Sequence, residues 1–183
     1  MFVSRAGFKL DHAMTAFDLD ATGLVCADLG CSTGGFVDCL LQRGAAKVYA
    51  IDTGYGVLDW KLRKDSRVVV MERTNAMHAT LPEPVGLITI DAGWTRQRHI
   101  LPAARRMLAA DGTVISLIKP HYEADPSDLR GGVLPVELIP KVFMRVAEEI
   151  DDAGFTLQAV AKSPNPHVGG NVELLAWLRP VTL

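Results

Sequence analysis

The sequence has no long hydrophobic run, few cysteines and no excess of positive charge. No apolar stretch approaches the roughly 18 to 20 residues of a membrane-spanning helix, and no basic start with an apolar core indicates a signal peptide. We therefore expect a cytoplasmic protein without a membrane partner. With 19 lysines and arginines against 21 aspartates and glutamates, the formal charge is −2. A nucleic-acid partner would therefore need a local basic face.

The three cysteines exclude a disulfide framework. Cys26, Cys31 and Cys39 match no zinc-binding spacing and cannot all pair, so we expect reduced, mostly buried thiols and no metal site. Hydrophobic residues make up 49% and charged residues 22% of the 183 positions, which is typical of a folded globular protein. The length and the lack of repeats or linkers predict one domain over residues 1–183.

Segments with strand character alternate with helical segments along most of the chain. Strands are predicted at 24–29, 47–51, 67–71, 87–90, 113–118, 156–161 and 172–178, and helices at 7–17, 35–43, 58–64, 97–109 and 136–153. This alternation implies a mainly parallel sheet with helices on both faces. The last two strands are joined by KSPNPHVGGN, which favours an antiparallel hairpin. The predicted fold is a doubly wound α/β sheet of seven strands, the last antiparallel.

Charged residues gather where the predicted strands end. Asp52, Asp91 and Lys119 each follow an apolar strand segment, as in ITIDAGW and SLIKPHYE. Open parallel sheets bind ligands outside the carboxyl ends of their strands. A reversed last strand begins at that same edge and brings Glu173 to it. Four charged groups at one edge are more than the solvation of strand ends normally requires.

A glycine-rich turn, ADLGCSTGGF, follows the first predicted strand. Gly30, Gly34 and Gly35 permit a tight turn before a helix, but the spacing matches neither G-x-G-x-x-G nor a Walker loop. Asp52 is placed one strand later to accept hydrogen bonds from a ribose diol. The pattern favours an adenosine-containing cofactor without phosphate binding, such as S-adenosylmethionine, and disfavours a nicotinamide-dependent oxidoreductase. A purely structural strand-turn-helix remains the alternative on spacing alone.

Several segments together resemble the FtsJ-like ribose methyltransferases, and within them the TlyA (hemolysin A) branch. They are FVSRAGFKL, DLGCSTGGFVDCLLQRGAAKVYAIDTGYGVLDWKLR, VVVMERTNA, LIKPHYE and GNVELLAWL, which cover nearly the whole chain in order. The resemblance implies a Rossmann-like class I methyltransferase fold, S-adenosylmethionine as cofactor, and 2′-O-methylation of ribosomal RNA, with RNA or ribosomal subunits as partner. The branch carries a small RNA-binding module ahead of this region, which we expect to be missing or removed here.

The resemblance also implies site residues. The catalytic set of the family falls on Lys9, Asp91, Lys119 and Glu173, and the cofactor positions on Gly30, Ser32, Gly34, Phe36, Asp52, Asn75 and Asp91. We expect Lys119 to hold or accept the proton of a ribose 2′-hydroxyl, with Asp91 and Lys9 fixing its position and Glu173 in support. From the residues alone, a solvated helix lysine is the better interpretation of Lys9, and Glu173 is equally well a surface partner of Lys162 or Arg179.

The chain departs from the family pattern beside the expected substrate face. After Asp91 it reads AGWTRQ where the family has a Ser-Phe-Ile-Ser-like stretch, and GGVLPVELIPKV lacks an expected arginine and histidine. Trp94 is then either a packing residue or a stacking platform for an RNA base. Basic stretches such as WKLRK and RQRH are solvated helix faces or phosphate contacts. Two other functions stay open, a non-catalytic module that binds cofactor or RNA, and a small-molecule methyltransferase.

Overall fold

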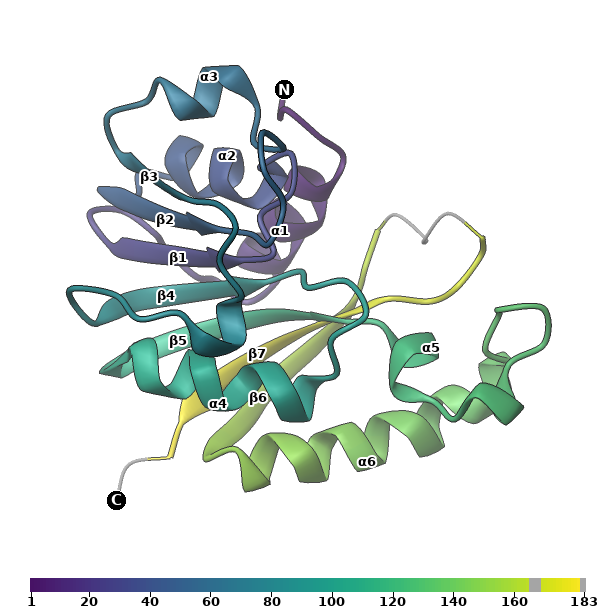
Figure 1. Ribbon diagram of the computed structural model, residues 1–183. Helices are drawn as coiled ribbons and strands as arrows, with labels where there is room; N and C mark the ends of the chain where they lie inside the picture. The colour runs from purple at the N-terminus through teal and green to yellow at the C-terminus, as the bar shows by residue number, and fades with distance from the viewer. Residues whose placement is uncertain (165–168, 182–183) are drawn as a thin grey trace.

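A computed structural model describes residues 1–164 and 169–181 of the chain, and its centre is one seven-stranded sheet in the order β3-β2-β1-β4-β5-β7-β6 (Figure 1). The strands are β1 Val25–Leu29, β2 Lys47–Ile51, β3 Val68–Met71, β4 Val85–Ile90, β5 Leu108–Ile118, β6 Phe155–Lys162 and β7 Leu174–Pro180. The helices are α1 Ala6–Ala16, α2 Gly35–Gln42, α3 Trp60–Arg63, α4 Gln97–Met107, α5 Pro120–Glu123 and α6 Ile139–Asp152, with 3-10 turns at Ala76–His78, Pro126–Asp128 and Val136–Leu138.

The strand directions confirm the predicted topology. β1 pairs in parallel with both β2 and β4, and β4 pairs in parallel with β5. β7 is antiparallel to both β5 and β6, and its register places Leu174 opposite Ile118. The start of β7 therefore lies beside the end of β5, as the sequence predicts. Part of the predicted hairpin link, residues 165–168, lies outside the described residues.

Helices cover both faces of the sheet (Figure 1). Each face has its own apolar core. Alternate strand residues point to opposite faces, so Ala27 and Leu29 of β1 pack with α4 and α6, whereas Cys26 packs with α1 and α2. Burial of these apolar side chains provides the main driving force for folding. The layers leave the carboxyl ends of the strands as the open edge of the sheet.

The structure corrects several predicted boundaries. The helix predicted at 97–109 ends at Met107, because Leu108 pairs with Val85 and extends β5 into a stretch with helical propensity. The helix predicted at 58–64 forms only over Trp60–Arg63. The short helix α5 was not predicted; it begins at Pro120, a residue suited to a first helical position.

Candidate active site

A cavity of about 480 Å³ opens at the carboxyl ends of the parallel strands. Its walls come from the N-terminal arm, the loops after β1, β2, β3 and β4, and the end of β5; they include Ser4, Ala6, Asp28, Gly30, Cys31, Ser32, Phe36, Asp52, Asn75, Asp91, Gly93, Thr95 and Lys119. Small-molecule sites typically enclose about 300–1,000 Å³ and form at this edge of open α/β sheets. The volume is therefore suitable for a nucleoside-sized ligand.

The glycine-rich loop brings backbone close to the loop after β4. Gly30 has a φ of +88°, and a Cβ there would lie 2.7 Å from the carbonyl oxygen of Asp91. Gly34 has a φ of +99° and precedes α2, where a side chain would collide with Leu58 and Leu62. Gly30 faces the cavity, whereas Gly34, predicted as a cofactor residue, is absent from its lining and serves the turn behind it.

Asp52 and Asn75 both line the cavity and both organise local backbone. Asp52 accepts hydrogen bonds from the N–H groups of Ser32 and Gly54, at 2.8 and 2.7 Å. The Asn75 side chain accepts from the N–H of Met77 at 3.0 Å. Each carboxylate oxygen has a second acceptor site, so Asp52 retains the capacity to accept a pair of hydroxyl groups.

Asp28 is a cavity residue that sequence reasoning missed. It lies within β1 and is 1% exposed, and its Oδ1 accepts a hydrogen bond from Thr89 at 2.7 Å. Its Oδ2 is buried without a hydrogen-bond partner among the described residues. Burial raises the pKa of Asp28 to about 8 against the effect of the Thr89 hydroxyl, and nearby Asp91 and Asp52 raise it further. The signal in the sequence was an aspartate within an apolar strand that leads into the glycine loop.

Lys119 and Asp91 meet at the ends of neighbouring strands. Lys119 Nζ donates a hydrogen bond to Asp91 Oδ1 at 2.5 Å, and both residues line the cavity. Their side chains are 12% and 21% exposed, so the pair is mostly shielded yet open to a ligand. The short helix α5 starts directly after Lys119 and turns the chain away, which leaves the lysine at the cavity.

Lys9 and Glu173 form a second ion pair outside the lining of the cavity. Lys9 Nζ lies 2.5 Å from Glu173 Oε2, with side-chain exposures of 14% and 0%. Lys9 is therefore a partly buried, paired lysine of α1, and its reading as a solvated lysine is wrong. The reading of Glu173 as a surface partner of Lys162 or Arg179 is also wrong, because its side chain is buried against α1.

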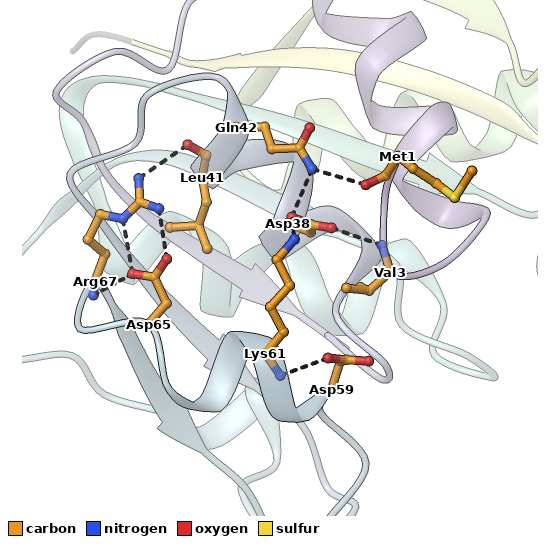
Figure 2. Close-up of polar contacts among 9 residues, drawn as sticks. All are labelled: Met1, Val3, Asp38, Leu41, Gln42, Asp59, Lys61, Asp65 and Arg67. Atoms are coloured by element: carbon orange, nitrogen blue, oxygen red, sulfur yellow. Dashed lines mark hydrogen bonds and ion pairs between the residues drawn. The ribbon is translucent and has the colours of Figure 1, made fainter.

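The arm that precedes α1 is held on α2 by Asp38 (Figure 2). Asp38 is 2% exposed and accepts hydrogen bonds from the N–H of Val3 at 2.8 Å and from the Gln42 side chain at 2.9 Å. Lys61 of α3 lies 3.6 Å from the same carboxylate. This contact places Ser4 and Ala6 in the cavity wall and sets the start of the helix that carries Lys9.

Trp94 projects at the rim between two cavity residues, Gly93 and Thr95. It is 84% exposed and has a φ of +61°, a region that non-glycine residues seldom adopt. Its ring stacks on Tyr122 with centroids 4.6 Å apart. Trp94 is therefore not a core residue, although one face of its ring packs on Tyr122.

Metal and membrane features are not found in the described part of the chain. Residues 1–164 and 169–181 contain no group of three or more histidine, cysteine, aspartate or glutamate side chains arranged to hold a metal ion. None of the helices within these ranges is long and apolar enough to cross a membrane.

A family model described as FtsJ-like methyltransferase matches residues 2–179. The 16S/23S rRNA (cytidine-2′-O)-methyltransferase TlyA of Mycobacterium tuberculosis is 41% identical over 99% of this chain and 69% of its own length. Hemolysin A of Brachyspira hyodysenteriae is 37% identical over 96% of this chain and 75% of its own length. The chain therefore spans about two thirds to three quarters of these relatives.

Solved structures agree with the fold. A proposed hemolysin from Streptococcus thermophilus superposes with a TM-score of 0.95 at 37% identity, over 98% of this chain and 67% of that protein. An S-adenosylmethionine-dependent methyltransferase from Mesorhizobium loti superposes with a TM-score of 0.69 at 15% identity, over 92% and 96% of the two chains. The second similarity supports the fold alone.

Proposed function

The chain belongs to the FtsJ-like methyltransferase family, and from this premise we propose that it transfers a methyl group from S-adenosylmethionine to a ribose 2′-hydroxyl of ribosomal RNA. The observation that carries the proposal is the Lys119–Asp91 pair in the wall of a nucleoside-sized cavity. The 41% identity to an rRNA cytidine-2′-O-methyltransferase supports the substrate class.

The cavity residues fit S-adenosylmethionine. This cofactor carries an ammonium group and a positively charged sulfur, and three acidic residues, Asp28, Asp52 and Asp91, line the cavity. Asp28 has one buried oxygen without a protein partner and a pKa raised to about 8 by burial, so a cationic donor beside it would favour its ionised form. We assign the ribose hydroxyls to Asp52, the adenine region to Asn75, and the loop contacts to Gly30, Ser32 and Phe36, with Gly34 shaping the turn.

The proposed roles of the catalytic residues follow from their contacts. When bound, the cofactor supplies an electrophilic methyl group. The protein must align a ribose hydroxyl with that group, and alignment of reacting groups contributes up to roughly 7–11 kcal/mol in favourable cases. Lys119 is placed to donate to the 2′-oxygen while Asp91 holds its ammonium group. Methyl transfer would break the carbon–sulfur bond of the cofactor as the carbon–oxygen bond formed, and the hydroxyl proton would pass to the Asp91 carboxylate, because an ammonium group has no site for a further proton.

The Lys9–Glu173 ion pair lies close to the end of β5, the strand that leads into Lys119. Glu173 immediately precedes β7, whose first residue lies opposite Ile118, the residue before Lys119. The Lys9–Glu173 pair therefore adds one positive and one negative charge close to the end of β5. We propose that the pair fixes α1 and the end of β5 relative to each other.

Trp94 is our candidate for contact with the substrate base. Exposed aromatic rings bind unstacked RNA bases, and such stacking is worth about 1–3 kcal/mol per base. The ring lies at the rim of the cavity and is already supported from one side by Tyr122.

Methyl transfer to ribosomal RNA tests the proposed function directly. The protein is incubated with labelled S-adenosylmethionine and with ribosomal subunits or purified rRNA, and methylated riboses are mapped by their resistance to alkaline cleavage. We expect label in one or a few riboses, and none with Lys119→Ala. Cofactor binding without label in any RNA or subunit would contradict the proposal and favour a non-catalytic module or a small-molecule substrate.

A further inference from the structure

Glu123 is a buried carboxyl group to which the proposed reaction assigns no role. It ends α5, four residues after Lys119, and is 3% exposed. Its Oε1 accepts a hydrogen bond at 2.9 Å from the N–H of Gln97, the first residue of α4. A carboxyl group is seldom buried to this extent without a specific partner, so the contact with Gln97 is the natural place to look for its role.

The contact joins the two segments that carry the Lys119–Asp91 pair. Asp91 begins the loop that leads into α4, and Lys119 directly precedes α5. The first four N–H groups of a helix have no partner within the helix, and the Glu123 carboxyl satisfies one of them from across the loop. A negative charge also suits this end of the helix.

Three further contacts tie the same two segments together. The Ser116 hydroxyl donates to Gln97 Oε1 at 2.7 Å, and Arg96 Nη2 donates to the carbonyl oxygen of Ala124 at 3.2 Å. The stacked pair of Trp94 and Tyr122 joins them at the rim. The loop that carries Asp91 is therefore fastened to the β5–α5 segment by residues outside the cavity lining.

Charged groups on neighbouring elements surround Glu123. Arg145 of α6 donates to the Glu123 carbonyl oxygen, and Glu149 of α6 and Arg96 before α4 act on the carboxyl group through their charges. Burial raises the pKa of Glu123 to about 7, helped by Glu149 and opposed by the Gln97 N–H, Arg96 and Arg145. The group therefore changes its charge near neutral pH.

We propose that Glu123 is a positioning residue of the methyltransferase: by capping α4 it holds the Asp91 loop against the end of β5 and so keeps Asp91 in contact with Lys119. This inference rests on the proposed function for its kinetic consequences. Glu123 lies outside the cavity lining, so its loss should lower turnover and leave cofactor affinity nearly unchanged.

Three variants test the proposal on the full chain. Glu123→Ala removes the cap, Glu123→Gln retains an acceptor for the Gln97 N–H without a charge, and Glu148→Ala is a control at an exposed position of α6. Displacement of a catalytic group by about 1 Å can cost about a hundredfold in rate, so we expect kcat of Glu123→Ala to fall by tenfold or more. The dissociation constant for S-adenosylmethionine should stay within a factor of two.

The conservative variant separates positioning from general stability. Glu123→Gln should recover most of kcat and should flatten the dependence of kcat on pH around 7, because the titrating group is gone. Amide hydrogen exchange over residues 91–97 should accelerate in Glu123→Ala and stay near wild type in Glu123→Gln and Glu148→Ala. This readout does not require activity, so it tests the cap even if the wild-type protein methylates no RNA.

The inference is overturned if Glu123→Ala keeps wild-type kcat, or if exchange over 91–97 does not change. Equal losses of kcat in Glu123→Gln and Glu123→Ala would also overturn it, because the cap would then not be the relevant feature. If Glu123→Ala fails to fold, Glu123→Asp provides the same readouts with a carboxyl group one methylene too short to reach Gln97.

Discussion

Lys9 and Glu173 are 164 positions apart in the chain and form an ion pair that joins α1 to the residue before β7, with Lys9 partly and Glu173 fully buried. Removal of one partner of a buried pair leaves a charge in a shielded place and typically costs about 3–5 kcal/mol. We therefore expect Lys9→Met to lower the melting temperature markedly and to reduce methyl transfer. The double variant Lys9→Met/Glu173→Gln should recover much of the stability without recovering activity.

A double-mutant cycle in thermal unfolding, run beside the methylation assay, checks this prediction. An additive cycle would show that the pair contributes no coupling. Restored activity in the double variant would argue that Lys9 acts through stability alone.

Replacement of Lys119 by arginine distinguishes two roles. Arginine keeps its charge and donor groups but does not lose a proton in proteins. If Lys119 orients the 2′-oxygen, as we propose, Lys119→Arg should keep measurable activity while Lys119→Ala loses it by about 10²–10⁴-fold. The two rates are compared in single-turnover assays at saturating cofactor. An equal loss of activity in Lys119→Arg and Lys119→Ala would indicate that Lys119 acts as a general base, a role that requires its neutral form and that arginine cannot take.

Removal of the Trp94 ring should weaken RNA binding without affecting the cofactor. Loss of one stacking contact worth about 1–3 kcal/mol corresponds to a rise in KM for RNA of about 5- to 150-fold. Trp60→Ala is a matched control, because Trp60 is also strongly exposed, at 67%. It lies on α3, which connects β2 to the edge strand β3, and β2 and β3 are separated from β5 by β1 and β4. A rise in KM that is equal in both variants would contradict a specific stacking role.

Gly30→Ala should abolish cofactor binding. A Cβ at this position would lie 2.7 Å from the Asp91 carbonyl oxygen, on a residue with a φ of +88°. Gly56→Ala is the control for backbone strain alone, because Gly56 has a φ of +69° with nothing within 4 Å of an added Cβ. Calorimetric titration with S-adenosylmethionine should show binding by the control and none by Gly30→Ala. If Gly30→Ala binds S-adenosylmethionine with wild-type affinity, the close approach of Gly30 to the Asp91 loop is not required for cofactor binding, and the prediction is wrong.

Asp28→Asn should stabilise the protein increasingly as pH rises. Burial raises the pKa of Asp28 to about 8 from the ordinary 3.8, so the folded state keeps a proton that the unfolded chain releases. The wild type therefore loses stability between about pH 4 and 8. Asparagine can still accept from Thr89. The gain in melting temperature, at about 2–4 °C per kcal/mol for a domain of this size, should be larger at pH 9 than at pH 5. A gain in melting temperature that does not depend on pH would contradict the raised pKa of the buried Asp28 carboxyl group.

Much of the fold is already determined by patterns local in the sequence. Alternating strand and helix segments predicted the topology, because each segment carries the periodicity of the surface it buries. The end of the helix at Met107 was not predictable in this way, since the pairing of Leu108 with Val85 depends on a partner 23 positions away.

The sequence by itself determined that Asp52, Asp91, Lys119 and Glu173 gather at one edge, because strand direction decides where each strand ends. Only the tertiary structure decided which charges pair, that Glu173 contacts Lys9 and Lys119 contacts Asp91. Side-chain pairing depends on packing between distant elements, and so does the burial that changes the pKa of Asp28 and Glu123. The spacing of residues along the sequence predicts neither the distances between these groups nor how far packing shields them from solvent.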